Sequence, residues 1–225
     1  MRLTYYGQSC FAVEMAGKNI LFDPFITPNE LAKDIKLEEI KADYILVSHG
    51  HADHIADCVT LAKQNNATVV GPFEVVTWLH QQGVENYHPM NTGGKWAFDF
   101  GTVKCTSAIH SSALPDGSYG ANPIGFLVTG EKNFYYSGDT ALTMDMQLIP
   151  RWAKPDFAVL PIGDNFTMGY EDAIMAAEMI QCRNIVGVHY DTFGYIKIDH
   201  EKVKKAFADA GLNLFLPRIG ESIDI

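Results

Sequence analysis

Long apolar segments and paired cysteines are both missing from this sequence. No stretch approaches the roughly 20 apolar residues that a membrane-spanning helix needs. The opening residues, MRLTYYGQSCFAVEM, lack the apolar run of a secretory signal peptide, because polar side chains interrupt them throughout. The four cysteines, Cys10, Cys58, Cys105 and Cys182, are scattered and form no CxxC pair. We therefore expect a cytoplasmic protein with reduced thiols and no membrane span.

Basic residues are also scarce. The 225-residue chain has 17 lysines and arginines against 27 aspartates and glutamates, which gives a formal net charge of -10. This balance argues against a broad nucleic-acid-binding surface and favours a small-molecule substrate. It does not exclude a nuclease whose metal ions supply the local positive charge.

The chain shows no linker, low-complexity tract or clear internal repeat. Hydrophobic residues make up 47% of the sequence and charged residues 20%, as in an ordinary globular protein. A chain of this length can bury a substantial core. We therefore predict a single domain spanning residues 1–225.

Apolar runs and turn residues predict a similar order of elements in both halves of the chain. In the first half we expect strands at 3–7, 10–15, 18–24, 43–49 and 67–71, and helices at 30–40, 53–65 and 73–83. In the second half we expect strands at 95–101, 102–110, 124–130, 132–139, 157–163, 184–190 and 213–220, and helices at 143–149, 170–181 and 200–211. Strands begin each half and strand–helix alternation ends it. This order predicts an α/β fold, a four-layer αββα sandwich in which two sheets pack face to face.

The stretch SHGHADHI, residues 48–55, gathers three of the eight histidines around an aspartate. It follows the apolar strand DYILVS, so it is a loop at a strand end, where catalytic groups often lie. Imidazole nitrogens and carboxylate oxygens together suit zinc, iron or manganese. A solvated polar loop is the plain alternative, but it does not account for HxHxDH directly after an apolar strand. The candidate metal ligands of this loop are His49, His51, Asp53 and His54.

Four residues in one loop cannot surround a metal ion alone, so further ligands are needed. Three polar residues end apolar or aromatic segments elsewhere: His110 after TVKCTSAI, Asp139 after KNFYYSG and His189 after NIVGV. Each of them alone is better explained as a hydrogen-bonded residue at a strand end. Their appearance together with HxHxDH predicts that they complete a metal site.

The order HxHxDH, His, Asp, His resembles the ligand order of the metallo-β-lactamase superfamily along nearly the whole chain. The stretches LFDPF, AIHSSA, SGDT, GDNFTMGYEDA and HYDTF are similar to small cytoplasmic metal-dependent hydrolases related to L-ascorbate-6-phosphate lactonase. N-acyl phosphatidylethanolamine phospholipase D is a more distant relative. The resemblance implies the αββα sandwich of that superfamily. Since its members often assemble, a homo-oligomer is also expected. It also implies a division of ligands: His49, His51 and His110 to a first metal, Asp53, His54 and His189 to a second, and Asp139 to both.

Such a site implies hydrolysis. Two divalent ions can lower the pKa of a shared water towards neutrality and polarise the attacked carbonyl or phosphoryl oxygen. Asp53 can bind a metal and also orient the attacking hydroxide, which makes it the candidate catalytic residue. We expect one or two divalent ions, zinc or manganese before nickel or iron. The expected substrate is a phosphodiester, a lactone or a related ester.

Residues near the predicted ligands are weaker candidates. Asp23 ends the strand NILFD, where it would orient a ligand histidine or simply begin a turn. Asp164 and Thr167 belong to a loop between a strand and a helix, which would border the substrate or serve only helix entry. Tyr190 and Asp191 follow His189 and would contact substrate or ligands, with ordinary turn roles as the alternative.

Other polar residues are better explained without chemistry. Ser111 and Ser112 follow a candidate ligand, but no free general base lies near them in the sequence to activate a serine nucleophile. His80, His88 and His200 fit surface or helix-end positions.

Four other functions compete with the ester hydrolase. A true β-lactamase with mixed ligands carries a cysteine where this chain has Asp139. Diiron oxygen reductases of this fold have HxE in the first motif, whereas this chain has HxH with His51 in place of the glutamate. Those proteins also carry a flavin partner. The relatives that process the 3′ end of tRNA are longer and bear an extra arm, and net negative charge disfavours RNA. An RNA-processing nuclease and a non-catalytic metal-binding protein nevertheless remain alternatives.

Overall fold

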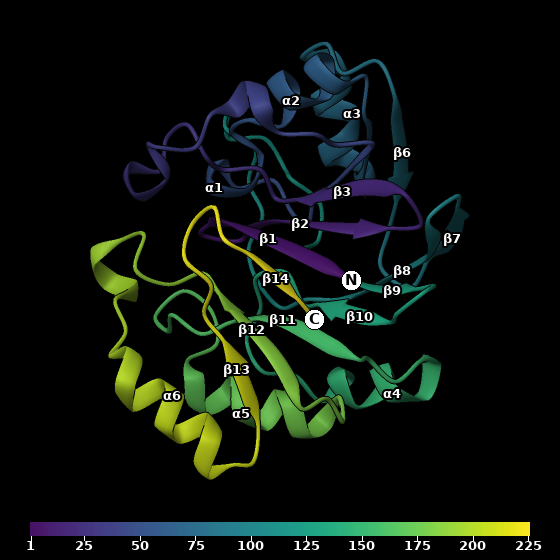
Figure 1. The fold of residues 1–225 in the computed structure, drawn as a ribbon. Coiled ribbons are helices and arrows are strands. Elements are labelled where there is room, and N and C mark those ends of the chain that lie inside the picture. Colours follow the sequence, from purple (N-terminus) through teal and green to yellow (C-terminus); the bar gives the residue numbers. More distant parts are fainter.

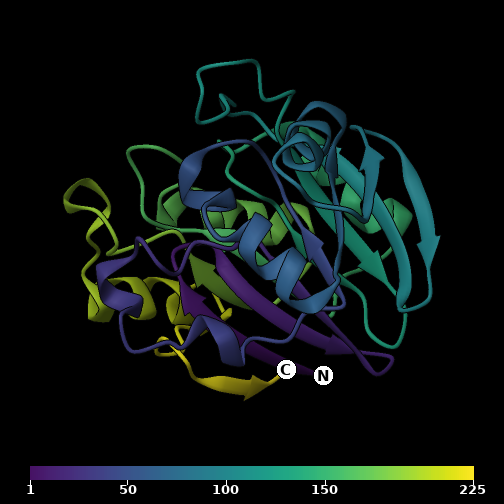
Figure 2. The same ribbon diagram turned by 90° about the horizontal axis from the view of Figure 1, so that it is seen from above.

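The computed structural model describes residues 1–225, which form two β-sheets packed face to face with helices outside each sheet (Figure 1). The predicted four-layer αββα sandwich is therefore confirmed. The two ends of the chain lie beside each other (Figure 2), because the last strand pairs with the first in the register Arg2 to Asp224. No helix is long and apolar enough to cross a membrane.

Each sheet has seven strands and combines antiparallel with parallel pairs. The first sheet contains, in spatial order, β14 (Ser222–Asp224), β1 (Arg2–Gly7), β2 (Cys10–Met15), β3 (Lys18–Phe22), β4 (Tyr44–Leu46), β5 (Thr68–Pro72) and β6 (Tyr87–Met90). The second contains β13 (Asn213–Phe215), β12 (Asn184–Val188), β11 (Phe157–Pro161), β10 (Phe134–Tyr136), β9 (Ile124–Thr129), β8 (Gly101–Ser107) and β7 (Lys95–Phe98). Strands β3 to β6 run parallel in the first sheet, and β10 to β13 run parallel in the second.

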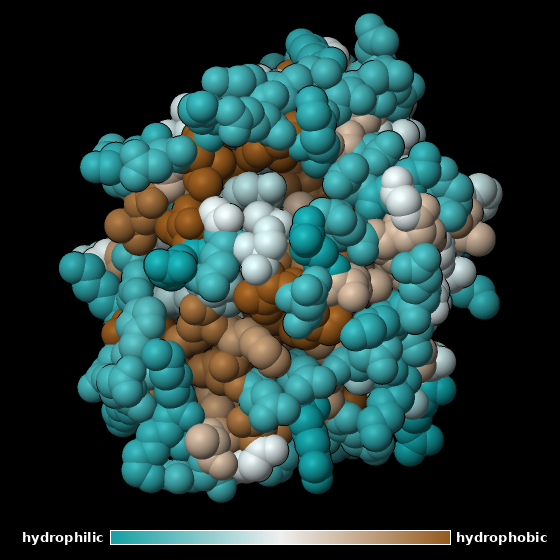
Figure 3. Space-filling view, in the orientation of Figure 1, coloured by the Kyte–Doolittle hydropathy of each residue, from teal (hydrophilic) through white to brown (hydrophobic).

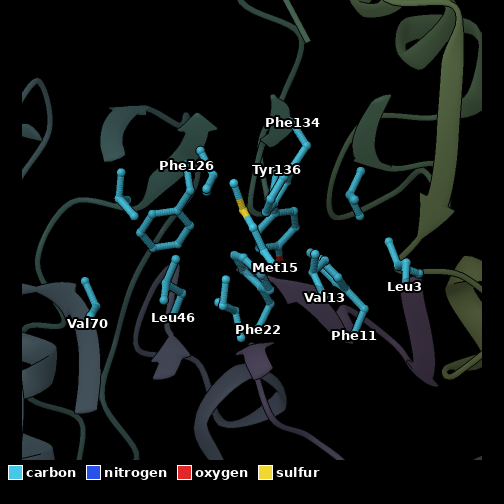
Figure 4. Close-up of a cluster of buried hydrophobic side chains, with 14 of the residues drawn as sticks. Leu3, Phe11, Val13, Met15, Phe22, Leu46, Val70, Phe126, Phe134 and Tyr136 are labelled. Carbon is cyan, nitrogen blue, oxygen red and sulfur yellow. The ribbon is translucent and has the colours of Figure 1, made fainter. Parts of the chain in front are cut away.

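Aromatic and branched side chains fill the space between the two sheets. Phe22 of the first sheet meets Phe126 and Tyr136 of the second edge to face, at ring-centroid distances of 6.2 and 5.7 Å. Figure 4 shows these rings from opposite sheets meeting across the core. Alternate residues of a strand point to opposite faces, so each sheet presents a second apolar face to its helices.

Helices cover those outer faces, as Figure 1 shows at its top and bottom. The first sheet carries the 3₁₀ turns η1 (Glu30–Ala32) and η2 (Leu37–Glu39) and the helices α1 (Ala52–Ile55), α2 (Cys58–Asn65) and α3 (Phe73–Gln81) in its connections. The second carries η3 (Met144–Leu148), α4 (Ile149–Trp152), α5 (Tyr170–Met179), η4 (Gly194–Ile196) and α6 (His200–Asp209). Helix α6 shows why such segments dock: Val203 and Phe207, one turn apart, are buried. Hydrophilic residues cover most of the face seen in Figure 3, and apolar residues show mainly near its middle.

The helix predicted at 30–40 is wrong. The segment forms only the two short turns η1 and η2. Ala32 and Ile40 are its only buried residues. Without a continuous apolar face to pack, the segment cannot offset the cost of starting a helix.

The predicted helix at 53–65 is broken into α1 and α2. Asp57 lies at the break and accepts backbone hydrogen bonds from Ile26 at 2.6 Å and Thr27 at 2.9 Å. Its own amide donates to the carbonyl of Pro24, which no continuous helix would allow. The predicted helix at 143–149 is likewise a 3₁₀ turn followed by the short α4.

Two edge strands were not predicted from the sequence. Strand β6 contains Pro89, which has no amide hydrogen to donate and is tolerated at the edge of a sheet. Strand β14 is three residues long and depends on pairing with β1, at the other end of the chain.

Candidate metal centre

The candidate ligands lie in the connections that follow four strands, with Asp53 and His54 in α1 and the other five in loops. Strand β4 ends at Leu46, β8 at Ser107, β10 at Tyr136 and β12 at Val188, so these strands are shorter than predicted. The strands β8, β10 and β12 point the same way, because β9 runs antiparallel to both its neighbours and β10 to β12 are parallel. Their carboxyl ends therefore meet at one edge of the second sheet, where ligands commonly bind in α/β proteins. All seven residues come together there: His49, His51, Asp53, His54, His110, Asp139 and His189.

The seven side chains form two groups in which the ligand atoms lie within 4.8 Å of one another. One group consists of His49, His51 and His110. The other consists of Asp53, His54, Asp139 and His189. This grouping matches the division implied by the resemblance, with Asp139 in contact with both groups.

The carboxylate of Asp139 has an environment that fits a cation. Its Oδ2 lies 3.1 Å from His54 Nε2, 3.0 Å from His189 Nε2 and 3.7 Å from His110 Nε2. Its Oδ1 is buried without any hydrogen-bond partner. A buried carboxylate oxygen normally has one, so the orphaned atom and the converging imidazoles fit a site that binds metal ions.

Burial sets the protonation of the first group. It lowers the pKa of His49 well below the usual value, and the neighbouring charge of His54 lowers it further. Burial also lowers the pKa of His51 and of His110. Neutral imidazoles have a free nitrogen lone pair, so this group can bind a cation without first losing protons.

The second group balances carboxylates against histidines. Burial by itself would raise the pKa of Asp139, but the charges of His189 and His54 outweigh it and hold that pKa well below its usual range. Burial would lower the pKa of His189, but Asp139 raises it to about 9. The pKa of His54 is also raised, against burial, by Asp139 and Asp53. These shifts favour the charged forms of the histidines and carboxylates alike, and a bound cation would take over the balancing positive charge.

Asp23, predicted as an orienting residue or a turn, contacts His54 directly. It is fully buried, and its Oδ2 lies 2.8 Å from His54 Nδ1. The same carboxylate accepts hydrogen bonds from the amide and hydroxyl of Ser48 and from the hydroxyl of Tyr136. Ser48 Oγ in turn lies 3.0 Å from His49 Nδ1. Asp23 therefore fixes one histidine directly and a second through Ser48.

Gln8 was missed by the sequence reasoning. Its side-chain amide donates to Asp53 Oδ2 at 2.9 Å, and its carbonyl accepts from the amide of His189 at 2.8 Å. The residue is buried in the turn between β1 and β2, far from both partners in the chain. The only signal in the sequence is that Gln8 and Ser9 lie between two predicted strands. That signal predicts a turn and does not predict a metal site.

Several of these residues have left-handed backbone conformations. Gln8, Asp23 and His189 have φ values of 52°, 41° and 57°. Residues other than glycine rarely adopt this conformation, and they do so mainly where the surrounding structure forces it, as at functional sites. Gly138 has φ +63°, and a Cβ there would lie 2.6 Å from the carbonyl oxygen of Ile124. Only glycine fits at this position, next to Asp139.

A cavity of about 710 Å³ opens over the centre. Its volume is in the range of small-molecule sites. Five candidate ligands line it: His51, Asp53, His110, Asp139 and His189. Three aromatic residues, Phe166, Phe193 and Tyr195, line it as well.

The weaker candidates lie around this cavity rather than in it. Asp164 and Thr167 flank the lining residue Phe166 but do not line the cavity themselves. Tyr190 and Asp191 line a neighbouring cavity, where Asp191 lies 2.7 Å from His200 Nε2.

Ser111, next to His110, lines the cavity with its Oγ 3.4 Å from His51 Nε2, whereas Ser112 has structural partners. Ser112 Oγ donates to the carbonyl of Gly120 at 2.6 Å and accepts from the amide of Gly50 at 3.0 Å. These bonds hold the loop that carries His51 and leave the hydroxyl engaged. His80 Nδ1 likewise lies 2.7 Å from the carbonyl oxygen of Val84, away from the centre.

Comparison with known proteins gives a consistent family. A model described as "Beta-lactamase superfamily domain" matches residues 18–190. A "UPF0173 metal-dependent hydrolase" of Christiangramia forsetii is 54% identical over 227 residues, covering 100% of both chains. One from Methylacidiphilum infernorum is 47% identical, covering 99% of both.

Solved structures agree with this. Igni18, described as a novel metallo hydrolase from Ignicoccus hospitalis, is 33% identical with a TM-score of 0.88, covering 99% of this chain and 97% of that chain. An isothiocyanate hydrolase from Delia radicum gut bacteria has a TM-score of 0.80 over 100% of this chain and 99% of its own, and at 20% identity it shows a shared fold alone. The superfamily inferred from the ligand order is confirmed. The chain belongs to the UPF0173 metal-dependent hydrolase family of the β-lactamase superfamily.

Proposed function

We propose that this metal-dependent hydrolase holds two divalent cations with the seven residues of the centre and cleaves a phosphodiester, a lactone or a related ester in a small molecule. The main support for this proposal is the position of Asp139, whose Oδ2 lies 3.0 Å from His189 Nε2 and 3.7 Å from His110 Nε2. One carboxylate thereby contacts both ligand groups beside an open cavity. Zinc and manganese are the expected ions, because imidazole nitrogens and carboxylate oxygens suit both.

The roles of the residues follow from their positions. We assign His49, His51 and His110 to one cation, Asp53, His54 and His189 to the other, and Asp139 to both. When bound, such ions lower the pKa of a water molecule towards neutrality and polarise the bond under attack.

Asp53 is the proposed catalytic residue, because it lines the cavity and its side chain is 23% exposed. Burial would raise its pKa, but the charge of His54 together with hydrogen bonds from His189 and His54 outweighs burial and holds the pKa well below the usual range. The ionised carboxylate accepts a hydrogen bond from the attacking water and orients it. Gln8, which donates to the same oxygen, keeps the carboxylate in place.

A metal-by-substrate matrix tests the proposal. The protein is loaded with zinc, manganese or nickel, its metal content is measured by elemental spectrometry, and turnover is assayed on bis-p-nitrophenyl phosphate, lactones and β-lactams. We expect metal in the purified protein and turnover of a phosphodiester or a lactone.

The Asp139→Ala variant should lose metal, and its kcat/KM should fall by about 100-fold or more. The loss should exceed that from removing a residue that only orients a ligand, because Asp139 is itself a proposed ligand. Asp209→Ala is the matched control, since Asp209 is an exposed residue of α6 that pairs only with Lys205. A protein without metal, or an Asp139→Ala variant that behaves like the control, would contradict the two-cation centre. Metal binding without turnover of any substrate would instead favour the non-catalytic alternative.

We also propose a cytoplasmic location for this reaction. The support is the presence of four free cysteines, all buried, which fits a reducing compartment.

A further inference from the structure

The cavity over the candidate metal centre has an aromatic wall. Phe166 comes from the loop between β11 and α5, and Phe193 and Tyr195 come from the loop after β12. The rings of Phe166 and Tyr195 meet edge to face, with centroids 6.1 Å apart and planes at 76°. Phe193 packs against the buried Phe25 at 6.3 Å, which anchors its loop. We call Phe166, Phe193 and Tyr195 the aromatic wall.

The three rings are exposed although they are apolar. Phe166 is 50% exposed, Phe193 37% and Tyr195 79%. Single exposed aromatic residues are normal on a protein surface. Three from two separate loops that face the same cavity as the candidate ligands form an apolar surface that a ligand would cover.

Away from the candidate ligands, the same cavity has no cationic side chain and offers an anion only the hydroxyls of Ser111, Thr192 and Tyr195. Neither lysine nor arginine lines it, and its acidic residues are the candidate ligands Asp53 and Asp139. Lys204 and Arg218 line the neighbouring cavity, which shares only Thr192 with this one. A phosphate or carboxylate away from the reacting bond would thus lose hydration and gain at most neutral hydroxyl donors, with no charged partner.

We infer that the substrate is neutral outside the reacting group and carries an aryl ring that packs on the aromatic wall. Phe166 and Tyr195 are then specificity-determining residues, because their edge-to-face pair is the part of the wall that a third ring can join by stacking. This inference rests on the proposed function, since it assumes that the reacting bond lies over the metal centre. It disfavours a phosphorylated lactone within the proposed substrate classes.

Hydroxamates test the inference by binding, without depending on turnover. Each ligand chelates a divalent metal through the same two oxygens, so only the attached group differs. Affinities of acetohydroxamate, phenylacetohydroxamate and succinic monohydroxamate for the zinc-loaded protein are measured by isothermal titration calorimetry. The methylene of phenylacetohydroxamate keeps its chelating group electronically close to that of the acetyl compound.

We expect phenylacetohydroxamate to bind about tenfold more tightly than acetohydroxamate, because the ring buries apolar surface on the wall. Succinic monohydroxamate should bind more weakly than acetohydroxamate. Phe166→Ala and Tyr195→Ala should each reduce the phenyl-to-methyl ratio by about threefold to tenfold and leave acetohydroxamate affinity unchanged. Phe73→Ala is the control, because Phe73 is an equally exposed phenylalanine on α3 and does not line the cavity.

Three outcomes would overturn the inference while leaving the metal centre intact. They are equal affinity for the phenyl and methyl ligands, tightest binding of the anionic ligand, and a ratio that neither wall variant alters. A wall variant that changes the sedimentation behaviour of the protein but not the ratio would likewise show that the rings serve self-association. If none of the hydroxamates binds the zinc-treated protein, the proposed metal centre itself fails.

Discussion

Four hydrogen-bond donors or imidazole nitrogens converge on the single carboxylate of Asp23. They belong to Ser48, which contributes both its amide and its hydroxyl, to His54 and to Tyr136. A fully buried carboxylate is tolerated only when its oxygens are satisfied in this way. The arrangement leaves His54 Nε2 pointing at Asp139, at 3.1 Å. At the scale of a residue, Asp23 contacts Nδ1 of the His54 ring and thereby orients the ring so that Nε2 faces Asp139.

Replacing this carboxylate by an amide tests that role. In Asp23→Asn the amide nitrogen would face donors instead of accepting from them, so His54 would lose its fixed orientation. We expect zinc affinity to fall by about 10- to 100-fold, the usual cost of losing a partner that orients a ligand. Competition with a chromophoric chelator measures it.

Asp43→Asn is the matched control for that variant. Asp43 lies at the start of β4, where it accepts a hydrogen bond from the amide of Asn19 and contacts no candidate ligand. Zinc affinity in Asp23→Asn equal to that of the control would show that Asp23 serves folding alone.

At the scale of an element, strands hold the two sheets together through their inner faces. Strand β9 is an interior strand of the second sheet, between β8 and β10. Its residue Phe126 is fully buried and contacts Phe22 across the interface and Tyr136 beside it. Both of those residues precede loops that carry Asp23 and Asp139. Packing between the sheets therefore supports the position of the centre.

Truncation of this ring should be costly. We expect Phe126→Ala to lower the free energy of unfolding by about 3–5 kcal/mol, through lost burial and the cavity left behind. Urea unfolding followed by circular dichroism checks the value. The exposed Phe73→Ala should change it by about 0.5 kcal/mol or less. A loss below about 1 kcal/mol in Phe126→Ala would mean that the interface repacks around the missing ring.

At the scale of the whole molecule, the centre joins the two sheets. The connection after β4 of the first sheet, which includes α1, carries His49, His51, Asp53 and His54, and loops after strands of the second sheet carry His110, Asp139 and His189. A cation can bind the ligands of both sheets together only when the chain is folded. Its binding energy would then add to the stability of the fold.

Removal of metal should therefore destabilise the protein. With free zinc at about 1,000 times its dissociation constant, the folded state gains about 4 kcal/mol, and a chelator should abolish this gain. Unfolding in urea is compared with zinc and with EDTA. Asp139→Ala should show little difference between the two conditions, which separates binding at the centre from binding to the four thiols. An equal zinc effect in that variant would contradict the assignment.

Local patterns in the sequence were enough to predict the layers of the fold and to indicate the candidate ligands. Alternating apolar residues predict strands because successive side chains point to opposite faces, and α6 is readable because Val203 and Phe207 are one turn apart. The density of HxHxDH and the polar residues after three apolar strands indicated the centre. The segment 30–40 misled because helical composition does not compensate for a missing buried face.

Tertiary structure alone decided what surrounds those ligands. Gln8 reaches Asp53 only because the turn after β1 packs against the centre, 45 positions away in the chain. The aromatic wall exists only because the loops after β11 and β12 open onto one cavity. A residue's own sequence neighbourhood determines its preferred backbone and which face it presents. Which distant residues it meets depends on the order and packing of strands, and no local pattern encodes that order. The sequence by itself therefore determined the set of candidate metal ligands, and the tertiary structure decided the shape and charge of the cavity that they line.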